Sequence, residues 1–132
     1  SRLHTYDKII LAPCLKTHSI AQFTGSLKLA VGLMKPSERI SFHLGNVQKK
    51  IADLNLVYSP DLIVMDARKC FIDKGPSSGT VREPLRILAS AGRVAIDIEG
   101  IRIIQEYDGN ALAGIEPEKL TQIRSAISLG IR

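Results

Sequence analysis

Basic and hydroxyl side chains gather just after an apolar run near the amino end of the chain. They form two short groups, Lys16, Thr17 and His18, then Thr24, Gly25 and Lys28. In open α/β sheets ligands bind beyond the carboxyl ends of strands, where helix amino termini present free N–H groups to an anion. The spacing is not that of a phosphate-binding P-loop. We therefore expect a site for a phosphate or a carboxylate, with solvated lysines and helix-capping threonines as the alternative.

A second set of polar residues is spread along the chain. It consists of His43, Asp66 and Asp97, to which His18 can be added. Imidazole nitrogens and carboxylate oxygens are metal ligands, and they are also the usual general acids and bases. We expect these four to be metal ligands or an acid/base group if their strands lie side by side. Taken singly, each also fits a helix-entry or turn role.

The clearest loop covers residues 73–80 (D-K-G-P-S-S-G-T). Glycine and proline punctuate it, and its serines can bond their own backbone. We include Gly75 and Gly79 among the ligand-binding candidates. No serine-nucleophile elbow is present, and Cys14 and Cys70 lie at strand ends without an activating motif, so no catalytic residue is assigned.

Strands and helices alternate along the chain. We predict strands at 8–13, 61–67 and 86–90, and helices at 24–34, 43–58 and 117–131. A helical crossover between the first two strands makes them parallel. Residues 93–104 alternate β-branched side chains around Glu99 and Gly100, a pattern that by itself favours strands. The expected fold is one α/β domain over residues 1–132, with three layers and a mostly parallel sheet flanked by helices.

Composition excludes several classes of function. The net charge of +5 favours an anionic partner, whereas aromatic residues at 5% and the absence of Trp argue against a base-stacking surface for nucleic acid. Two cysteines without C-x-x-C spacing cannot ligate an iron–sulfur cluster within this chain. No apolar run reaches the roughly 20 residues of a membrane span. The sequence indicates neither the cellular compartment nor the oligomeric state. We take the cytoplasm as the default compartment.

Several motifs, in order, resemble the domain of unknown function 362 family. They are A-P-C-L-K-T-H-S (12–19), T-G-S-L-K (24–28), P-D-L-I-V-M-D (60–66), G-P-S-S-G (75–79), I-L-A-S (87–90) and V-A-I-D (94–97), with His43 before an amphipathic helix. The resemblance covers nearly the whole chain.

The resemblance has three implications. Members commonly have more chain before the K-T-H segment, so we expect this sequence to be the carboxyl-terminal part of a longer protein. The V-A-I-D segment looks like a helix in the family, so we replace the strand prediction for 93–104 with a helix that has Asp97 near its amino end. Some members carry a separate ferredoxin-like module, so an iron–sulfur domain or protein is an expected partner. In that alternative function this domain is an accessory module whose polar residues are mainly structural.

Overall fold

The computed structural model describes residues 5–42 and 45–132, apart from the side chains of residues 40 and 41. Its strands are β1 (Ile10–Leu11), β2 (Lys16–His18), β3 (Gln22–Thr24), β4 (Leu62–Ala67), β5 (Cys70–Phe71), β6 (Val81–Arg82) and β7 (Arg86–Ser90). Its helices are α1 (Ser26–Leu29), α2 (Pro36–Phe42), α3 (Val47–Leu54), α4 (Arg93–Gln105) and α5 (Thr121–Ser128). Short 3-10 helices cover Ala30–Leu33, Asn55–Val57 and Pro117–Lys119.

The main sheet has the order β1-β4-β7. Strands β1 and β4 are parallel, with Ile10 opposite Leu62, so the parallel pairing predicted from the crossover is confirmed. Strands β4 and β7 are antiparallel, with Val64 opposite Ala89. The mixed α/β class is therefore confirmed, but the sheet is small and mixed where we expected a mostly parallel one.

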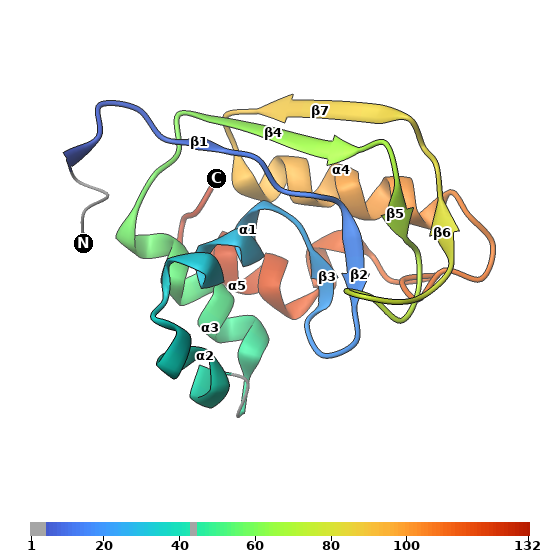
Figure 1. Cartoon of the computed structure of the whole chain (residues 1–132), viewed down its shortest axis with the longest axis horizontal. Coiled ribbons are helices and arrows are strands. Elements are labelled where there is room, and N and C mark those ends of the chain that lie inside the picture. The colour runs from blue at the N-terminus through green and yellow to red at the C-terminus, as the bar shows by residue number, and fades with distance from the viewer. Residues whose placement is uncertain (1–4, 43–44) are drawn as a thin grey trace.

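Helices cover one face of this sheet (Figure 1). Alternate side chains of β4 explain this, because Ile63 and Met65 are buried beneath the sheet while Leu62 on the other face is exposed. Exposed Ile10 and Ile87 belong to the other two strands of the sheet. Among the described residues the third layer that we expected on the outer face is not seen.

Helix α4 runs under the sheet, with α1 and α5 on its far side (Figure 1). Eight of its thirteen residues are buried, so it is apolar on more than one side. Gly100 allows close packing on the sheet, because a Cβ atom there would lie 2.9 Å from Leu15 Cδ1 and 3.1 Å from Met65 Sδ. The helix that the family resemblance implied for residues 93–104 is confirmed, and the strand pattern was misleading.

Two predicted elements differ from the structure near the first polar group. The segment after β1 forms an antiparallel hairpin, β2 with β3, in which Lys16 lies opposite Thr24. The helix predicted for 24–34 is accordingly shorter and begins at Ser26. Pro36, two residues beyond the predicted end of that helix, opens a further helix, α2. Proline is well tolerated there, because the first helical N–H has no partner within the helix.

The other predicted elements are close to the observed ones. Strands β4 and β7 match 61–67 and 86–90, and the loop at 73–80 connects β5 with β6. In the described part of the predicted helix at 43–58, which is residues 45–58, the structure has α3 and a 3-10 helix. The amino end of α3 is capped by Asn46, whose side chain accepts a hydrogen bond from the Lys49 N–H. The predicted helix at 117–131 is likewise a 3-10 turn followed by α5.

Candidate functional site

A pocket of about 440 Å³ lies beside the β2–β3 hairpin and α1. Lys16, Thr24 and Lys28, three of the residues predicted to bind an anion, line it together. The hairpin brings the first two together, because they face each other across the strands. Helix α1 follows directly and adds Lys28. Arg39 is a further lining residue, so the pocket has three basic side chains.

The two lysines have no counter-ion in the described part of the chain. No hydrogen bond or ion pair involves either ammonium group there, although seven ion pairs form elsewhere among those residues. Lys28 is half-buried, and both its burial and the neighbouring charge of Lys16 lower its pKa. The two positive charges therefore repel each other across a partly desolvated space.

Two further groups shape the polar part of the pocket. The Arg39 guanidinium donates hydrogen bonds to the carbonyls of Gly32 (3.0 Å) and Met34 (3.1 Å), which fixes its position. Thr24 Oγ1 is buried and has no hydrogen-bond partner among the described residues. An unsatisfied buried hydroxyl is costly, but this oxygen is too buried to be a contact for a ligand in the pocket.

Asp97 occupies the position that we had expected a ligand to take at the start of α1. Its carboxylate accepts hydrogen bonds from the backbone N–H groups of Ser26 (2.6 Å) and Leu27 (3.0 Å). Gly25 is needed at this approach, since a Cβ atom there would collide with Asp97 Oδ1. The amide groups that were expected to bind an anion are thus already satisfied within the protein.

Burial raises the pKa of Asp97 to about 6, although hydrogen bonds from Leu27 and Ser26 and the charge of Arg93 act in the opposite direction. Asp97 is completely buried. It connects α4 with α1, which is a structural role.

Thr17, Gly75 and Gly79 also have structural roles. Thr17 lies one residue along β2 from Lys16 and is buried, because successive side chains of a strand face opposite ways. Its Oγ1 donates to the Phe71 carbonyl (3.1 Å) and accepts from the Gly75 N–H (3.3 Å). Gly79 has φ +132°, which other residues rarely adopt. The loop at 73–80 reaches the pocket through Pro76.

The predicted metal or acid/base set is not brought together in the described residues. His18 Nδ1 accepts hydrogen bonds from the N–H groups of Ile20 and Ala21, both at 3.1 Å, within the hairpin turn. Asp66 forms a two-point ion pair with Arg68, which lowers the pKa of Asp66 to about 2. His43 lies outside the described residues.

Within residues 5–42 and 45–132, no three His, Cys, Asp or Glu side chains are grouped as metal ligands would be. Lys16 lines the 440 Å³ pocket, but His18 and Asp66 are not among the lining residues of that pocket. These observations give no support to a metal at this place, and the metal ligands remain a sequence-based prediction.

The sequence reasoning missed much of the pocket, including three residues whose side chains differ in origin. Cys14, Arg39 and Pro76 line it, and we had assigned none of them to a site. The cysteine had a signal, because residues 14 and 16 share a side of an extended strand. Arg39 and Pro76 come from α2 and from the loop at 73–80, and no local pattern places either beside β2.

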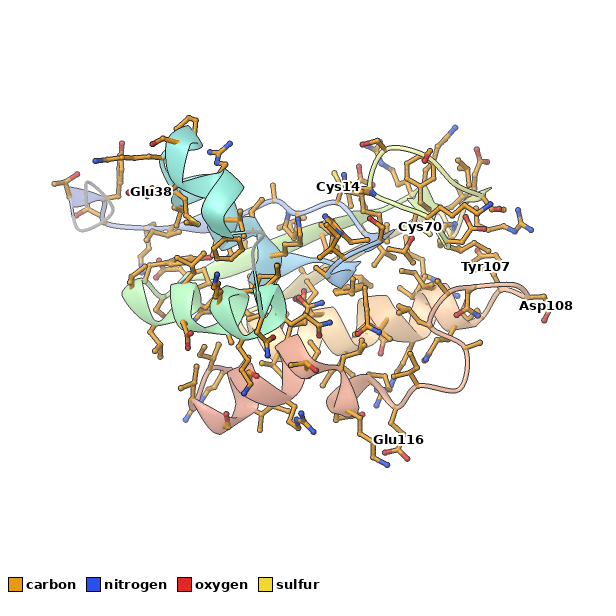
Figure 2. The ribbon with its side chains drawn as sticks, turned by 90° about the horizontal axis from the view of Figure 1, so that it is seen from below. Cys14, Glu38, Cys70, Tyr107, Asp108 and Glu116 are labelled. Carbon is orange, nitrogen blue, oxygen red and sulfur yellow. The ribbon has the colours of Figure 1, made fainter. Side chains whose placement is uncertain are left out.

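The two cysteines also line a second, mostly apolar pocket of about 270 Å³. Cys14 is exposed and Cys70 is buried, and both are free thiols. Burial raises the pKa of the Cys70 thiol. Figure 2 shows both side chains at the end of the molecule that holds β5 and β6. The two thiols do not bear on an iron–sulfur partner, which stays a sequence-based prediction.

A family model described as "Domain of unknown function (DUF362)" matches residues 1–102. The chain belongs to this family. The match to the DUF362 family includes every residue that lines the 440 Å³ pocket and ends within α4. No curated protein and no solved structure is significantly similar to the chain. In the described residues, no helix combines the length and the apolar character needed to cross a bilayer.

Proposed function

We propose that this domain binds an anionic small molecule, with a phosphate or carboxylate group held between Lys16 and Lys28. One observation carries the proposal. Two ammonium groups without a counter-ion in the described residues line the same pocket, close enough for one to lower the pKa of the other. Placing like charges together in a partly buried space is unfavourable unless an opposite charge joins them.

An anion would relieve this repulsion and gain charge-assisted hydrogen bonds. Arg39 supplies a third positive charge at the same pocket. The binding does not use the amino end of α1, because Asp97 already accepts its N–H groups. Side-chain cations therefore account for the proposed affinity.

The test compares two lysine variants in NMR titrations with inorganic phosphate and with succinate. Lys16→Ala should weaken binding by about 1–3 kcal/mol, which is the usual contribution of a hydrogen bond to a charged group. Lys49→Ala is the matched control. It removes the same charge from an exposed position on α3, where only a weak field that is screened by salt acts on the ligand.

Equal losses of affinity in the two variants would contradict the proposal, because they would show that anions respond to the net charge of +5 alone. Unchanged affinity in both variants would place any bound anion elsewhere. The expected result is a large loss for Lys16→Ala only, with chemical-shift changes centred on β2, β3 and α1.

A further inference from the structure

The charge balance of the pocket indicates a ligand with more than one negative charge. Lys16, Lys28 and Arg39 line it, and no Asp or Glu is among its lining residues in the described chain. The nearest buried carboxyl, Asp97, has both oxygens engaged by the backbone of α1. A single carboxylate would leave the repulsion between the two lysines partly uncompensated, whereas a doubly charged group can contact both.

The remainder of the wall is apolar, and the pocket exceeds the size of the charged group. Pro13, Leu29 and Val31 are part of this wall, and Pro76 contributes from the loop at 73–80. A volume of 440 Å³ is many times the share of about 30 Å³ that one water molecule has in the liquid. An inorganic oxyanion would therefore leave most of the apolar surface in contact with water.

We propose that the ligand is a phosphate monoester with a compact apolar body. This inference rests on the proposed function and specifies its ligand class. The doubly charged phosphate lies between Lys16 and Lys28, and the ester group covers the apolar wall that includes Leu29. A phosphate monoester is almost fully doubly charged at pH 8, because its second pKa is about 6.

Three probes separate charge from shape: phenyl phosphate, benzoate and inorganic phosphate. Benzoate has the ring with a single charge, and inorganic phosphate has the double charge without the ring. In calorimetric titrations of the whole chain at pH 8, phenyl phosphate should bind at least tenfold more tightly than either of the others. A smaller preference over benzoate would overturn the role of the second charge, and a smaller preference over inorganic phosphate would overturn the role of the apolar wall.

A leucine pair tests the wall itself. Leu29→Ala should weaken phenyl phosphate binding at least threefold and change inorganic phosphate binding less than twofold. The control is Leu56→Ala, which removes another exposed leucine side chain from a 3-10 helix outside this pocket and should change the binding of neither probe. Equal effects of Leu29→Ala on both probes would contradict the inference.

The two proposals fail in different ways. If inorganic phosphate and benzoate bind in a manner that depends on Lys16, and phenyl phosphate binds no better, the proposed function stands and the ligand class is wrong. If none of the three probes binds, both proposals are wrong.

Discussion

A buried carboxyl group does at this domain's centre what an external anion does in many α/β proteins. Asp97 accepts the first free N–H groups of α1 from a position on α4, about 70 residues later in the sequence. The cost of burying the charge is reflected in its pKa of about 6. Stability should therefore depend on pH through this residue.

We predict that the free energy of unfolding falls by about 3 kcal/mol in total as pH rises from well below 3.8 to well above the folded pKa of about 6. The pKa of Asp97 is higher in the folded state, so the folded chain binds the proton more tightly. Stability from this group is full below 3.8 and is lost as pH rises through the folded pKa. Urea unfolding across this range measures the slope, which Asp97→Asn should abolish.

Exposed Asp53→Asn is the control and should retain the slope. Asp61, Asp66 and Asp73 have lowered pKa values, so their effect has the opposite sign and lies below pH 3.8. A slope that persists unchanged in Asp97→Asn would show that another group is responsible.

For single residues, the sequence predicted two of the three basic residues that line the pocket, Lys16 and Lys28, but not Arg39. These two lysines line one pocket because the β2–β3 hairpin lies between them and returns the chain to α1 beside β2. Thr17 was placed in the same site, although the alternation of β2 turns it into the core. The error arose because no strand had been predicted at residues 16–18, and without a strand no alternation of side chains is expected.

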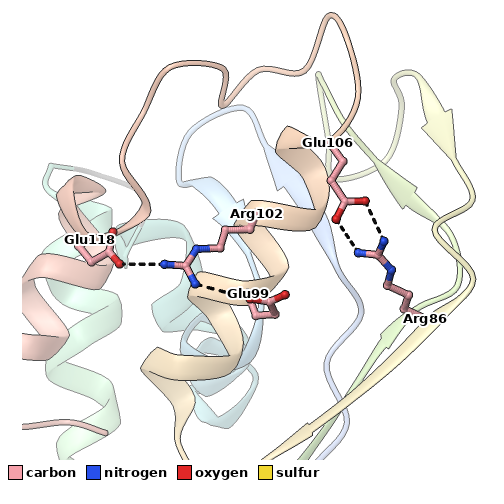
Figure 3. Close-up of polar contacts among 5 residues, drawn as sticks. All are labelled: Arg86, Glu99, Arg102, Glu106 and Glu118. Atoms are coloured by element: carbon pink, nitrogen blue, oxygen red, sulfur yellow. Dashed lines mark hydrogen bonds and ion pairs between the residues drawn. The ribbon is translucent and has the colours of Figure 1, made fainter.

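Among the elements, α4 has two arginines in opposite environments. The buried Arg93 Nη1 donates to Asn55 O (2.8 Å), Asn55 Oδ1 (3.0 Å) and Tyr58 O (3.1 Å), and its guanidinium lies 5.2 Å from the Tyr58 ring centre. Arg102 is exposed and pairs with Glu99 and Glu118 (Figure 3). We expect the buried hydrogen bonds of Arg93 to contribute more to the free energy of unfolding than the exposed ion pairs of Arg102.

Arg93→Ala should lower the free energy of unfolding by about 3 kcal/mol or more, because it leaves buried acceptors without partners. Arg102→Ala, the control on the same helix, should cost at most about 1 kcal/mol, since water and salt screen exposed ion pairs. Urea denaturation of both variants measures the difference. Similar losses would show that the network around Arg93 contributes no more than a surface pair.

Gly75 tests the loop that connects β5 with β6. A Cβ atom there would collide with the Thr17 carbonyl oxygen, which is backbone and cannot move aside alone. We expect Gly75→Ala to cost about 1–3 kcal/mol, as other overpacked positions do. Gly32→Ala is the control, because a Cβ atom there meets nothing within 4 Å, and its effect should stay within about 1 kcal/mol. Thermal unfolding monitored by circular dichroism compares them.

Two helices show why the spacing of apolar residues predicted one helix correctly and failed to predict another. Helix α3 buries Val47 and Ile51 and exposes Lys49, so its apolar stripe was visible in the sequence. Helix α4 is packed on several sides, and its isoleucines face both the sheet and the other helices. Its buried side includes the charged residues Arg93 and Asp97, whereas Ala95 is exposed, so polarity does not follow burial along this helix. The sequence therefore shows no clear apolar stripe, and only the family resemblance identified the helix.

In the whole molecule, residues late in the chain support the hairpin that carries the pocket. Gln122 on α5 is buried, and its Nε2 donates to the carbonyls of Phe23 (3.1 Å) and Ala21 (3.3 Å). These contacts join residues about 100 positions apart. No local pattern could have predicted them, because they depend on how α5 packs against the hairpin.

Gln122→Ala should destabilise the whole chain by about 1–3 kcal/mol, since it leaves two buried carbonyls without these donors. The transitions followed by far-UV circular dichroism and by tyrosine fluorescence should move together, as in a single cooperative unit. Gln48→Ala removes an exposed hydrogen bond to the same hairpin, at Gln22, and should change stability by less than about 0.5 kcal/mol. Separated transitions in Gln122→Ala would show that the hairpin melts alone.

The contact of Gln122 with the hairpin also sets an order of events during synthesis. Ribosomes add about 5–20 residues per second, so roughly 5–20 s pass between translation of the hairpin and translation of Gln122. For most of that interval the pocket residues as far as Arg39 are already made, whereas α5, which holds Gln122, is not. The growing chain therefore carries its cationic residues without the support that shapes them into a pocket. We expect ligand binding to begin only after the carboxyl-terminal helix has left the ribosome.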